Sequence, residues 1–515
     1  MQTLNQTNRK ISLLVALIVA VLSVDMSCSR THFYEDYKRG EVLLAGLFSI
    51  HEKTVNDECD TTLNVQALAS AEAMVYAIDQ VNKDAYLLPN ITLGYRIFDT
   101  CGIPSRANAI VFSFVIKNAL KEGIRMLNTT RDERARTFNL LWSGNQISTE
   151  PIAAVIGPGD SASSVVVASM LQVGNLPQIS PSSTSDELSQ SYYKTFFRTV
   201  PPDSQQAKAI SDIIEYFKWS YIAVIGSDSS YGRYGVRALK DEAHKNNTYC
   251  IHSTDYFPSS NYENKIQRIV ARLKKATNVN VIVLWAGDIS SIYYIFQESY
   301  KQQLFGRTWI APDGWSDATS LFTTKYSAVI GGFIGTTLRN FSVSGFENNL
   351  LSINSSSRRS QVNMWWREFW KDVNNCSQFS WKGCGGKQTS INEDLFSVMR
   401  TTTWAYVIDA VQAAAHAFDS EYRCPLDHST LSQVSQVTCL PKENDILSSN
   451  ILRALAKIQF QGLTGSISFN RNGDSPRSAA TTLPTFSSFP VALPRSEKLA
   501  PGTEPLRRCY SSRRT

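Results

Sequence analysis

The chain has 515 residues, of which 43% are hydrophobic and 19% charged, a composition ordinary for globular proteins and a length that allows at least two cores. The formal net charge is +6, and acidic and basic residues are interleaved except for an arginine-rich stretch between 507 and 514. Nucleic-acid binding needs a concentrated basic surface, so composition and charge argue against a nucleic-acid partner.

The N-terminus has the pattern of a secretory signal peptide. Arg9 and Lys10 precede an apolar run, Ile11 to Val24, and small residues follow that run. We predict a signal peptide over residues 1–29, with cleavage near Cys28. A membrane anchor is the alternative, but the run is shorter than the roughly 18 apolar residues that a spanning helix needs. No later stretch reaches that length, so we expect a secreted, soluble product.

Cysteines and glycan acceptors agree with export. The chain has nine cysteines, none in CxxC spacing, which favours disulfides over a zinc or thioredoxin-like site. Asn-x-Ser/Thr triplets, the acceptors of N-glycans in exported proteins, are spread along the sequence. They begin at Asn90, Asn128, Asn246, Asn340, Asn354 and Asn375. Together these features predict an extracellular domain.

Apolar strand-like runs alternate with amphipathic helical stretches along the chain. The first series is strand Val42–Phe48, helix Ala69–Val81, strand Ile91–Ile97, helix Ala107–Leu120, strand Ile152–Ile156, helix Ala162–Val173 and strand Gln178–Ser180. The second is helix Ala207–Phe217, strand Tyr221–Ile225, helix Gly232–Lys245, helix Lys265–Lys275 and strand Val279–Leu284. Strands separated by helices predict parallel sheets with both faces covered. Two series predict two lobes, with a crossing at Pro201-Pro202-Asp203. The polar residues 341–395 are interpreted as a long surface excursion.

The sequence lacks the common signatures of enzymes. It contains no HExxH, GxSxG, Walker lysine motif or DxDxDG calcium loop, and its six histidines are scattered. We therefore do not predict an enzyme. The turn Gly157-Pro-Gly-Asp-Ser161 follows a strand and opens a helix, which presents free N–H groups to an anion such as a ligand carboxylate. Alternatively, Ser161 is only a helix N-cap, and spacing alone leaves both interpretations open.

Several motifs together resemble the ligand-binding region of class C G-protein-coupled receptors. They are Ala73-Met74, Ala77-Ile-Asp79, Leu87 to Gly94, Tyr95 to Cys101, Pro177 to Ser180, Ser182 to Ser185, Phe197 to Asp203, Asp212 to Trp219 and Asp228 to Arg233. Some are most similar to calcium-sensing receptors and others to metabotropic glutamate receptors. The resemblance runs from about residue 40 to Asp474. It implies an α/β fold of the bilobed periplasmic-binding-protein type I, the Venus flytrap, in which hinge strands join two parallel-sheet lobes.

The resemblance also implies an order of domains. The expected parts are lobe 1 over residues 41–201 and 335–460 with an insertion at about 341–395, lobe 2 over 202–334, a truncated return toward lobe 2 over 461–474, and a disordered tail over 475–515. The tail is rich in Ser, Pro and Arg and has no periodicity. The cysteine-rich and seven-helix regions of a complete receptor do not follow, so we expect a truncated chain.

In this family, an amino-acid-like ligand binds between the lobes. The resemblance implies that hydroxyls of lobe 1 hold its α-carboxylate and α-ammonium, while lobe 2 brings carboxylates and a tyrosine ring to the ammonium. The residues at the matching positions are Ser161, Ser182 and Thr184 in lobe 1, and Asp203, Tyr231 and Asp313 in lobe 2. Asp203 and Asp313 could instead be turn caps, and Tyr231 a core residue.

Two positions depart from the glutamate receptors, which bring an arginine and a lysine of lobe 1 to the distal carboxylate of glutamate. The matching residues here are Ser70 and Thr403. Burying an unpaired carboxylate costs several kcal/mol. We therefore expect a neutral or basic L-amino acid to be preferred over glutamate, in a pocket that Asp313 makes acidic. Calcium as a modulator follows from the resemblance alone. We assign no metal site, because the sequence does not assemble the six to eight oxygens that calcium needs, and expect no cofactor.

The resemblance extends to the cysteines. The implied or suggested pairs are Cys59 with Cys101, Cys424 with Cys439, and Cys376 with Cys384. Cys250 matches the cysteine that bonds to the cysteine-rich stalk, so without a stalk we expect a free thiol. Relatives link their protomers through cysteines in the loop that matches residues 121–150, which here contains none. A homodimer or heterodimer would therefore form by packing alone, through the apolar faces of helices 107–120 and 162–173. These faces are equally interpretable as ordinary core.

The implied mechanism is lobe closure around the ligand. In a full-length receptor at the plasma membrane, closure would reach a G protein through the stalk and the membrane helices. The chain as written would bind without signalling, as a soluble ligand trap or a dominant-negative partner. The alternative is the ectodomain of a guanylyl-cyclase-type or ionotropic receptor, which shares the fold but not this set of Ser, Thr, Asp and Tyr.

Overall fold

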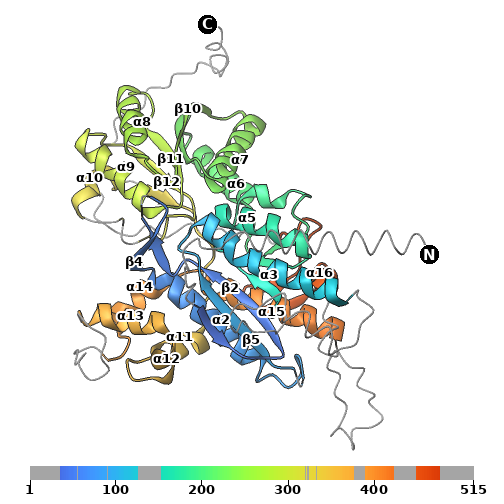
Figure 1. The fold of residues 1–515 in the computed structure, drawn as a ribbon. Coiled ribbons are helices and arrows are strands. Elements are labelled where there is room, and N and C mark those ends of the chain that lie inside the picture. The colour runs from blue at the N-terminus through green and yellow to red at the C-terminus, as the bar shows by residue number, and fades with distance from the viewer. Residues whose placement is uncertain are drawn as a thin grey trace, which may run out of the picture.

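The computed structural model describes residues 35–475, apart from residues 55, 90, 126–151, 319–320, 322–323, 332, 376–388 and 423–447. The predictions that fall outside the described residues are the signal peptide, the acceptors Asn90 and Asn128, the pairs Cys376–Cys384 and Cys424–Cys439, and the tail after Ser475. The described chain folds into two α/β lobes (Figure 1). The predicted fold class is confirmed.

Lobe 1 is built on a six-stranded sheet in the order β1-β5-β2-β6-β7-β8. Its strands are β1 (Glu35–Lys38), β2 (Val42–Phe48), β5 (Leu93–Asp99), β6 (Ile152–Ile156), β7 (Gln178–Ser180) and β8 (Phe196–Arg198). Neighbouring strands are parallel except β1, which runs antiparallel to β5. Every residue of β2 and β6 is buried, which explains their continuous apolar runs. The carboxyl ends of the parallel strands share one edge of the sheet.

Helices cover both faces of this sheet. On one face, α2 (Val65–Val81) packs with α15 (Trp404–Tyr422) and α16 (Ser448–Leu455) in the largest apolar core. The Asn64 side chain caps α2, which therefore begins four residues before the predicted start. On the other face lie α3 (Pro104–Arg125) and α5 (Ser161–Leu171), followed by the 3-10 helix η1 (Gln172–Gly174).

The helix faces considered for dimerisation are largely core in their described parts. Ile110 and Phe114 of α3 and Val167 of α5 are buried against the sheet. Exposed apolar side chains remain at Phe112 and Val173, which are 46% and 73% exposed. The ordinary-core interpretation therefore accounts for most of the apolar pattern of these helices.

In its described part, the polar segment 341–395 is not a surface excursion, contrary to the prediction. Its described part contains α11 (Ser344–Leu351), α12 (Arg358–Val362), α13 (Met364–Val373) and α14 (Glu393–Met399). Trp365, Trp366 and Trp370 of α13 are buried in the lobe 1 core. Arg359 of α12 bonds to the Glu72 carboxylate on α2 at 2.8 Å. The average composition of the segment is polar, but helical spacing gathers its few aromatic residues on one buried face.

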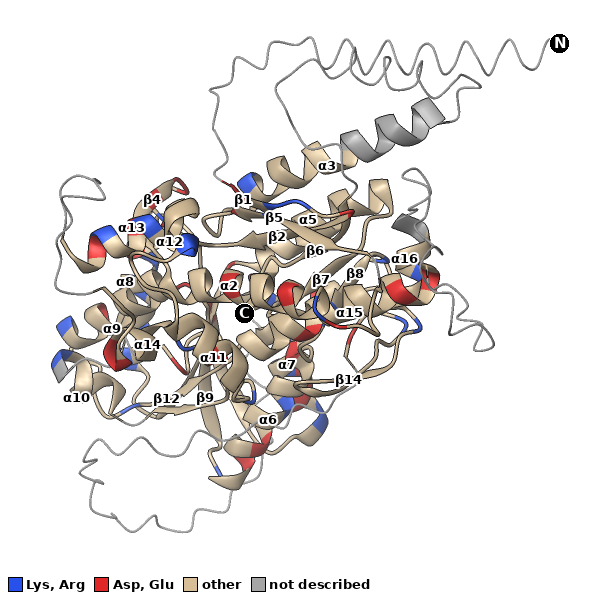
Figure 2. Cartoon of the chain, turned by 90° about the horizontal axis from the view of Figure 1, so that it is seen from below, with Lys and Arg blue, Asp and Glu red and all other residues tan. Residues whose placement is uncertain are grey.

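Lobe 2 is built on an all-parallel, five-stranded sheet in the order β10-β9-β11-β12-β13. Its strands are β9 (Tyr221–Ser227), β10 (Cys250–Phe257), β11 (Val281–Trp285), β12 (Thr308–Ala311) and β13 (Phe333–Gly335). Its helices are α6 (Asp203–Tyr216) and α7 (Ser230–Asn246) on one face, and α8 (Glu263–Lys275), α9 (Ile289–Lys301), η4 (Thr324–Tyr326) and α10 (Ser327–Ile330) on the other. Basic and acidic residues are interspersed over the ribbons of both lobes (Figure 2).

The chain passes between the lobes at Pro201-Pro202 and again after β13. Beyond α16, β14 (Phe460–Gly462) and β15 (Gly465–Ile467) form a hairpin on lobe 1, where the Asp409 carboxylate of α15 accepts bonds from two backbone N–H groups of the hairpin turn. The backbone N–H of Arg198 on β8 bonds to the carbonyl of Gly473 at 3.0 Å. Residues 461–474 therefore pack on lobe 1 instead of returning toward lobe 2, because lobe 1 supplies their hydrogen-bond partners.

The structure contains the predicted disulfide between Cys59 and Cys101. It joins the end of β5 to a hairpin of β3 (His51–Lys53) and β4 (Cys59–Leu63). Cys250 is also disulfide-bonded, so the predicted free thiol is wrong. A sequence does not reveal which cysteines come within bonding distance. Within the described parts of the chain, no helix combines the length and apolar character needed to cross a bilayer.

Candidate functional site

The residues proposed for the site lie where strands of lobe 1 end. Ser161 follows β6, Ser182 and Thr184 follow β7, and Asp203 follows β8. In parallel α/β sheets, ligands bind in the crevice outside the carboxyl ends of the strands. Residues separated by about 40 positions in sequence therefore meet along one edge.

Ser161 is buried at the first turn of α5, but it does not cap that helix. The N-cap is Asp160, whose carboxylate accepts a bond from the Ser163 backbone N–H at 2.7 Å. The Ser161 hydroxyl instead accepts a bond from the backbone N–H of Ser185 at 3.2 Å. Thr184 is buried as well, whereas Ser182 is half-buried. The start of α5 and the loop after β7 thus form one hydrogen-bonded unit.

Lobe 2 contributes a tyrosine and two carboxylates. The Tyr231 hydroxyl, at the start of α7, donates to Asp313 Oδ1 at 2.6 Å and accepts from the Gly314 backbone N–H at 3.1 Å. Burial and the negative charge of Asp313 raise the pKa of Tyr231 well above its ordinary value, so the phenol keeps its proton. Asp313 is therefore held by a hydrogen bond from Tyr231.

Asp203 is fully buried, and its carboxylate is poorly compensated. It is the first residue of α6, but neither carboxylate oxygen has a hydrogen-bond partner among the described residues. Burial, together with the negative charges of Asp313 and Asp186, raises its pKa well above the usual range. The nearby Thr184 hydroxyl and the charge of Arg198 oppose this shift only in part. A group in this state gains most from a positive charge placed beside it.

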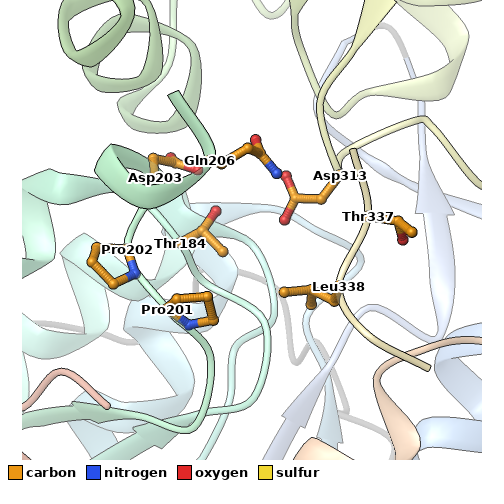
Figure 3. A pocket seen from close by; sticks show the side chains of 8 residues that line it. All are labelled: Thr184, Pro201, Pro202, Asp203, Gln206, Asp313, Thr337 and Leu338. Atoms are coloured by element: carbon orange, nitrogen blue, oxygen red, sulfur yellow. The ribbon is translucent and has the colours of Figure 1, made fainter. Parts of the chain in front are cut away.

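The two lobes enclose a small cavity between these carboxylates. Its volume is about 20 Å³, enough for about one water molecule. The lining residues are Thr184, Pro201, Pro202, Asp203, Gln206, Asp313, Thr337 and Leu338. In Figure 3, the Gln206 amide points toward the Asp313 carboxylate, and the two lobe crossings border the cavity. An amino acid needs more room, so the lobes must separate before it can enter.

Hydrogen bonds hold the lobes together beside this cavity. The Ser230 hydroxyl of lobe 2 donates to the Ser185 hydroxyl of lobe 1 at 2.8 Å, and Ser185 donates to the Ser230 carbonyl at 3.2 Å. Nearby, the 3-10 helix η2 (Asp186–Ser189) ends at its C-cap residue Gln190. The side-chain amide of Gln190 donates to the Tyr234 hydroxyl of α7 at 3.0 Å. The molecule is therefore in a closed arrangement.

Ser70 and Thr403, the positions that depart from glutamate receptors, are neighbours. Their hydroxyl oxygens are 3.3 Å apart, although the residues are separated by 333 positions. Ser70 lies on α2, and Thr403 immediately precedes α15. Both positions contribute neutral hydroxyls, and neither supplies a cation.

Sequence reasoning missed four residues that the structure places at the site, namely Gln206, Ser230, Thr337 and Leu338. Gln206 lies one helical turn after Asp203, which is a signal that helical spacing contains. Ser230 lies within a quoted family motif next to Tyr231. Leu338 had no local signal, because it reaches the cavity only through the second crossing between the lobes.

Potential metal-ligand side chains were found close together at one place among the described residues. The three-residue grouping of metal-ligand donors found among them is Cys59, Asp99 and Cys101. Both sulfurs of this group are in the disulfide, so they are not thiolate ligands.

The fold and the site can be compared with known proteins. A family model described as "Receptor family ligand binding region" matches residues 69–480. The chain belongs to this family. It is 32% identical over 351 residues to the extracellular calcium-sensing receptor of Bos taurus, covering 66% of this chain and 30% of that receptor.

Two further relatives support the same family. The chain is 29% identical over 451 residues to metabotropic glutamate receptor 4 of Mus musculus, covering 85% of this chain and 47% of the relative. It is 33% identical over 382 residues to the metabotropic glutamate receptor of Drosophila melanogaster, covering 72% and 38%. The predicted resemblance to class C receptors is confirmed, and these relatives are receptors, not enzymes. The chain spans between about a third and a half of their length.

Proposed function

We propose that this chain is an extracellular module that binds an L-amino acid between its lobes, with a neutral or basic amino acid preferred over glutamate. The observation that carries the proposal is Asp203, a fully buried carboxylate without hydrogen-bond partners at the meeting point of the lobes. Such a residue lowers stability, and a positively charged ligand group offsets that cost.

Each end of the ligand has complementary groups in this arrangement. Asp203 and Asp313, with the Tyr231 ring, suit an α-ammonium, while the Thr184 and Ser182 hydroxyls suit an α-carboxylate. Glutamate adds a second carboxylate, which would meet more negative charge and the neutral hydroxyl pair of lobe 1. Closing around the ligand expels water and strengthens these interactions.

Lobe closure is also the basis for a wider role. In a full-length receptor, ligand contacts made only in the closed form would stabilise that form, and the change would reach a G protein. A non-covalent dimer through exposed parts of α3 and η1, such as Phe112 and Val173, fits this scheme. Calcium as a modulator remains a proposal by resemblance. A free chain would act as a ligand trap.

Isothermal titration calorimetry of the secreted protein with a panel of L-amino acids tests the ligand class. We expect Asp203→Asn to lower amino-acid affinity by at least about tenfold, because a charge-assisted hydrogen bond is lost. The same substitution should leave the thermal midpoint unchanged or higher, since it removes an uncompensated buried charge. Asp212→Asn, at an exposed position of the same helix, is the matched control.

Two results would contradict the proposal. One is glutamate binding that is tight while neutral and basic amino acids give no heat. The other is an Asp203→Asn variant that folds and binds with unchanged affinity.

A further inference from the structure

Asp160 is an acidic residue at the cleft edge of lobe 1, and it is not among the residues proposed to hold the ligand. It follows β6, one position before Ser161, and the adjoining turn lies against the loop after β7. A Cβ built on Gly159 would be 3.7 Å from the Ser182 Cβ. Asp160 thus lies in the same row of strand ends as the residues proposed to grip the ligand.

The two carboxylate oxygens of Asp160 have different surroundings. Oδ1 caps α5 by accepting the Ser163 backbone N–H at 2.7 Å. Oδ2 is buried and has no hydrogen-bond partner among the described residues. Burial raises the pKa of this carboxyl, against the opposing effects of its hydrogen bonds to Ser163 and of the more distant Lys53 ammonium. Lys53 itself bonds to Asp57 at 2.9 Å.

This arrangement changes the charge that a ligand meets at lobe 1. One N–H group at the start of α5 is already occupied by the protein's own carboxylate, so the helix attracts an external anion less strongly. A ligand carboxylate beside Ser161 would also lie close to the negative Asp160. Asp203 and Asp313 add negative charge from lobe 2. A ligand with a single positive group can neutralise the negative charge of only one lobe, and the charge of the other lobe stays uncompensated.

We propose that Asp160 is a specificity-determining residue that selects a basic L-amino acid, whose second positive group it meets at lobe 1. The inference rests on the proposed function, because it assumes that the ligand's α-ammonium lies at Asp203. It narrows the ligand from neutral or basic amino acids to those with a cationic side chain. A neutral amino acid would leave Oδ2 buried and unpaired.

The test compares L-arginine with L-alanine on the full secreted chain and its Asp160→Asn variant by titration calorimetry. Asparagine caps helices as well as aspartate, so the variant keeps the Ser163 contact and loses only the charge. We expect the wild type to favour arginine. In the variant, arginine affinity should fall by about tenfold or more while alanine affinity stays equal or rises. Asp212→Asn controls for general loss of negative charge.

The outcomes separate this proposal from the one on which it rests. An unchanged ratio of arginine to alanine affinity in Asp160→Asn, with both ligands lost in Asp203→Asn, overturns the role of Asp160 and leaves the amino-acid site intact. A wild-type protein that binds alanine as tightly as arginine also overturns the role of Asp160 and leaves the amino-acid site intact. A wild type that binds neither amino acid overturns both proposals. Thermal midpoints of each variant confirm that the proteins compared are folded.

Discussion

Replacing Asp474 with alanine should destabilise lobe 1 through a buried ion pair. Asp474 belongs to the turn after the last hairpin, and its carboxylate accepts from Arg198 Nε at 2.8 Å and lies 2.6 Å from Nη2. The Arg198 side chain has no exposed surface, and that of Asp474 is 8% exposed. Arg198 also donates to the carbonyls of Ser183 and Ser185 at 3.2 and 3.0 Å. The pair thus joins the C-terminal turn to the loop of the proposed ligand site.

The size of the effect follows from this burial. Removing one partner of a buried ion pair leaves an uncompensated charge and costs about 3–5 kcal/mol. That is a large part of the 5–15 kcal/mol, roughly, by which domains are stable. Removing both charges should be less harmful, so Asp474→Ala combined with Arg198→Met should recover part of the loss. Asp212→Asn breaks an exposed pair with Lys208 and should cause little change.

Urea unfolding followed by tryptophan fluorescence measures these free energies. The reasoning is refuted if Asp474→Ala is as stable as the control, or if the double variant is no more stable than the single one. Amino-acid affinity should also weaken in Asp474→Ala. Asp474 holds Arg198 in place, and Arg198 in turn holds the carbonyls of Ser183 and Ser185 in the loop of the proposed ligand site.

Two further predictions concern stability. Burial disfavours the charged form of His51, but hydrogen bonds to Asp99 and Glu368 outweigh it and raise its pKa to about 9. The protonated His51 should therefore contribute up to about 3 kcal/mol to the free energy of unfolding. This contribution should be complete below pH 6.5 and lost as pH rises through about 9. Urea midpoints measured from about pH 6 to about pH 10 should show this loss, and His51→Gln should flatten it. A Cβ at position 235 would lie 2.0 Å from the Trp285 ring, so Gly235→Ala should cost about 1–3 kcal/mol; an unchanged thermal midpoint would contradict this.

Regular alternation made the architecture predictable from the sequence. β6 and β7 have the predicted bounds, because strands buried on both faces of a parallel sheet leave a strong apolar signal. Helix α8 differs from its prediction only at its start. The errors fall where average composition hides a pattern. The tryptophans of α13 are few in a polar segment, yet they are enough to hold that segment against the core.

Chain ends and cysteine partners were beyond local reasoning. Nothing near Cys250 in the sequence shows whether it is bonded, and nothing near Asp474 shows that Arg198 lies beside it. Arg198 and Asp474 lie 276 positions apart along the chain. Buried charges need partners wherever these can be found, and sequence separation does not limit the choice.

The sequence by itself determined the two-lobed α/β architecture, the receptor family and the identities of the polar residues at the strand ends, because hydrophobic periodicity and local motifs encode them. Only the tertiary structure decided which of those residues are buried in surroundings of low polarity. It left Asp203 and one oxygen of Asp160 buried without partners, while Asp313 received a hydrogen bond from Tyr231. Desolvation depends on everything packed around a group, and most of that packing comes from distant parts of the chain.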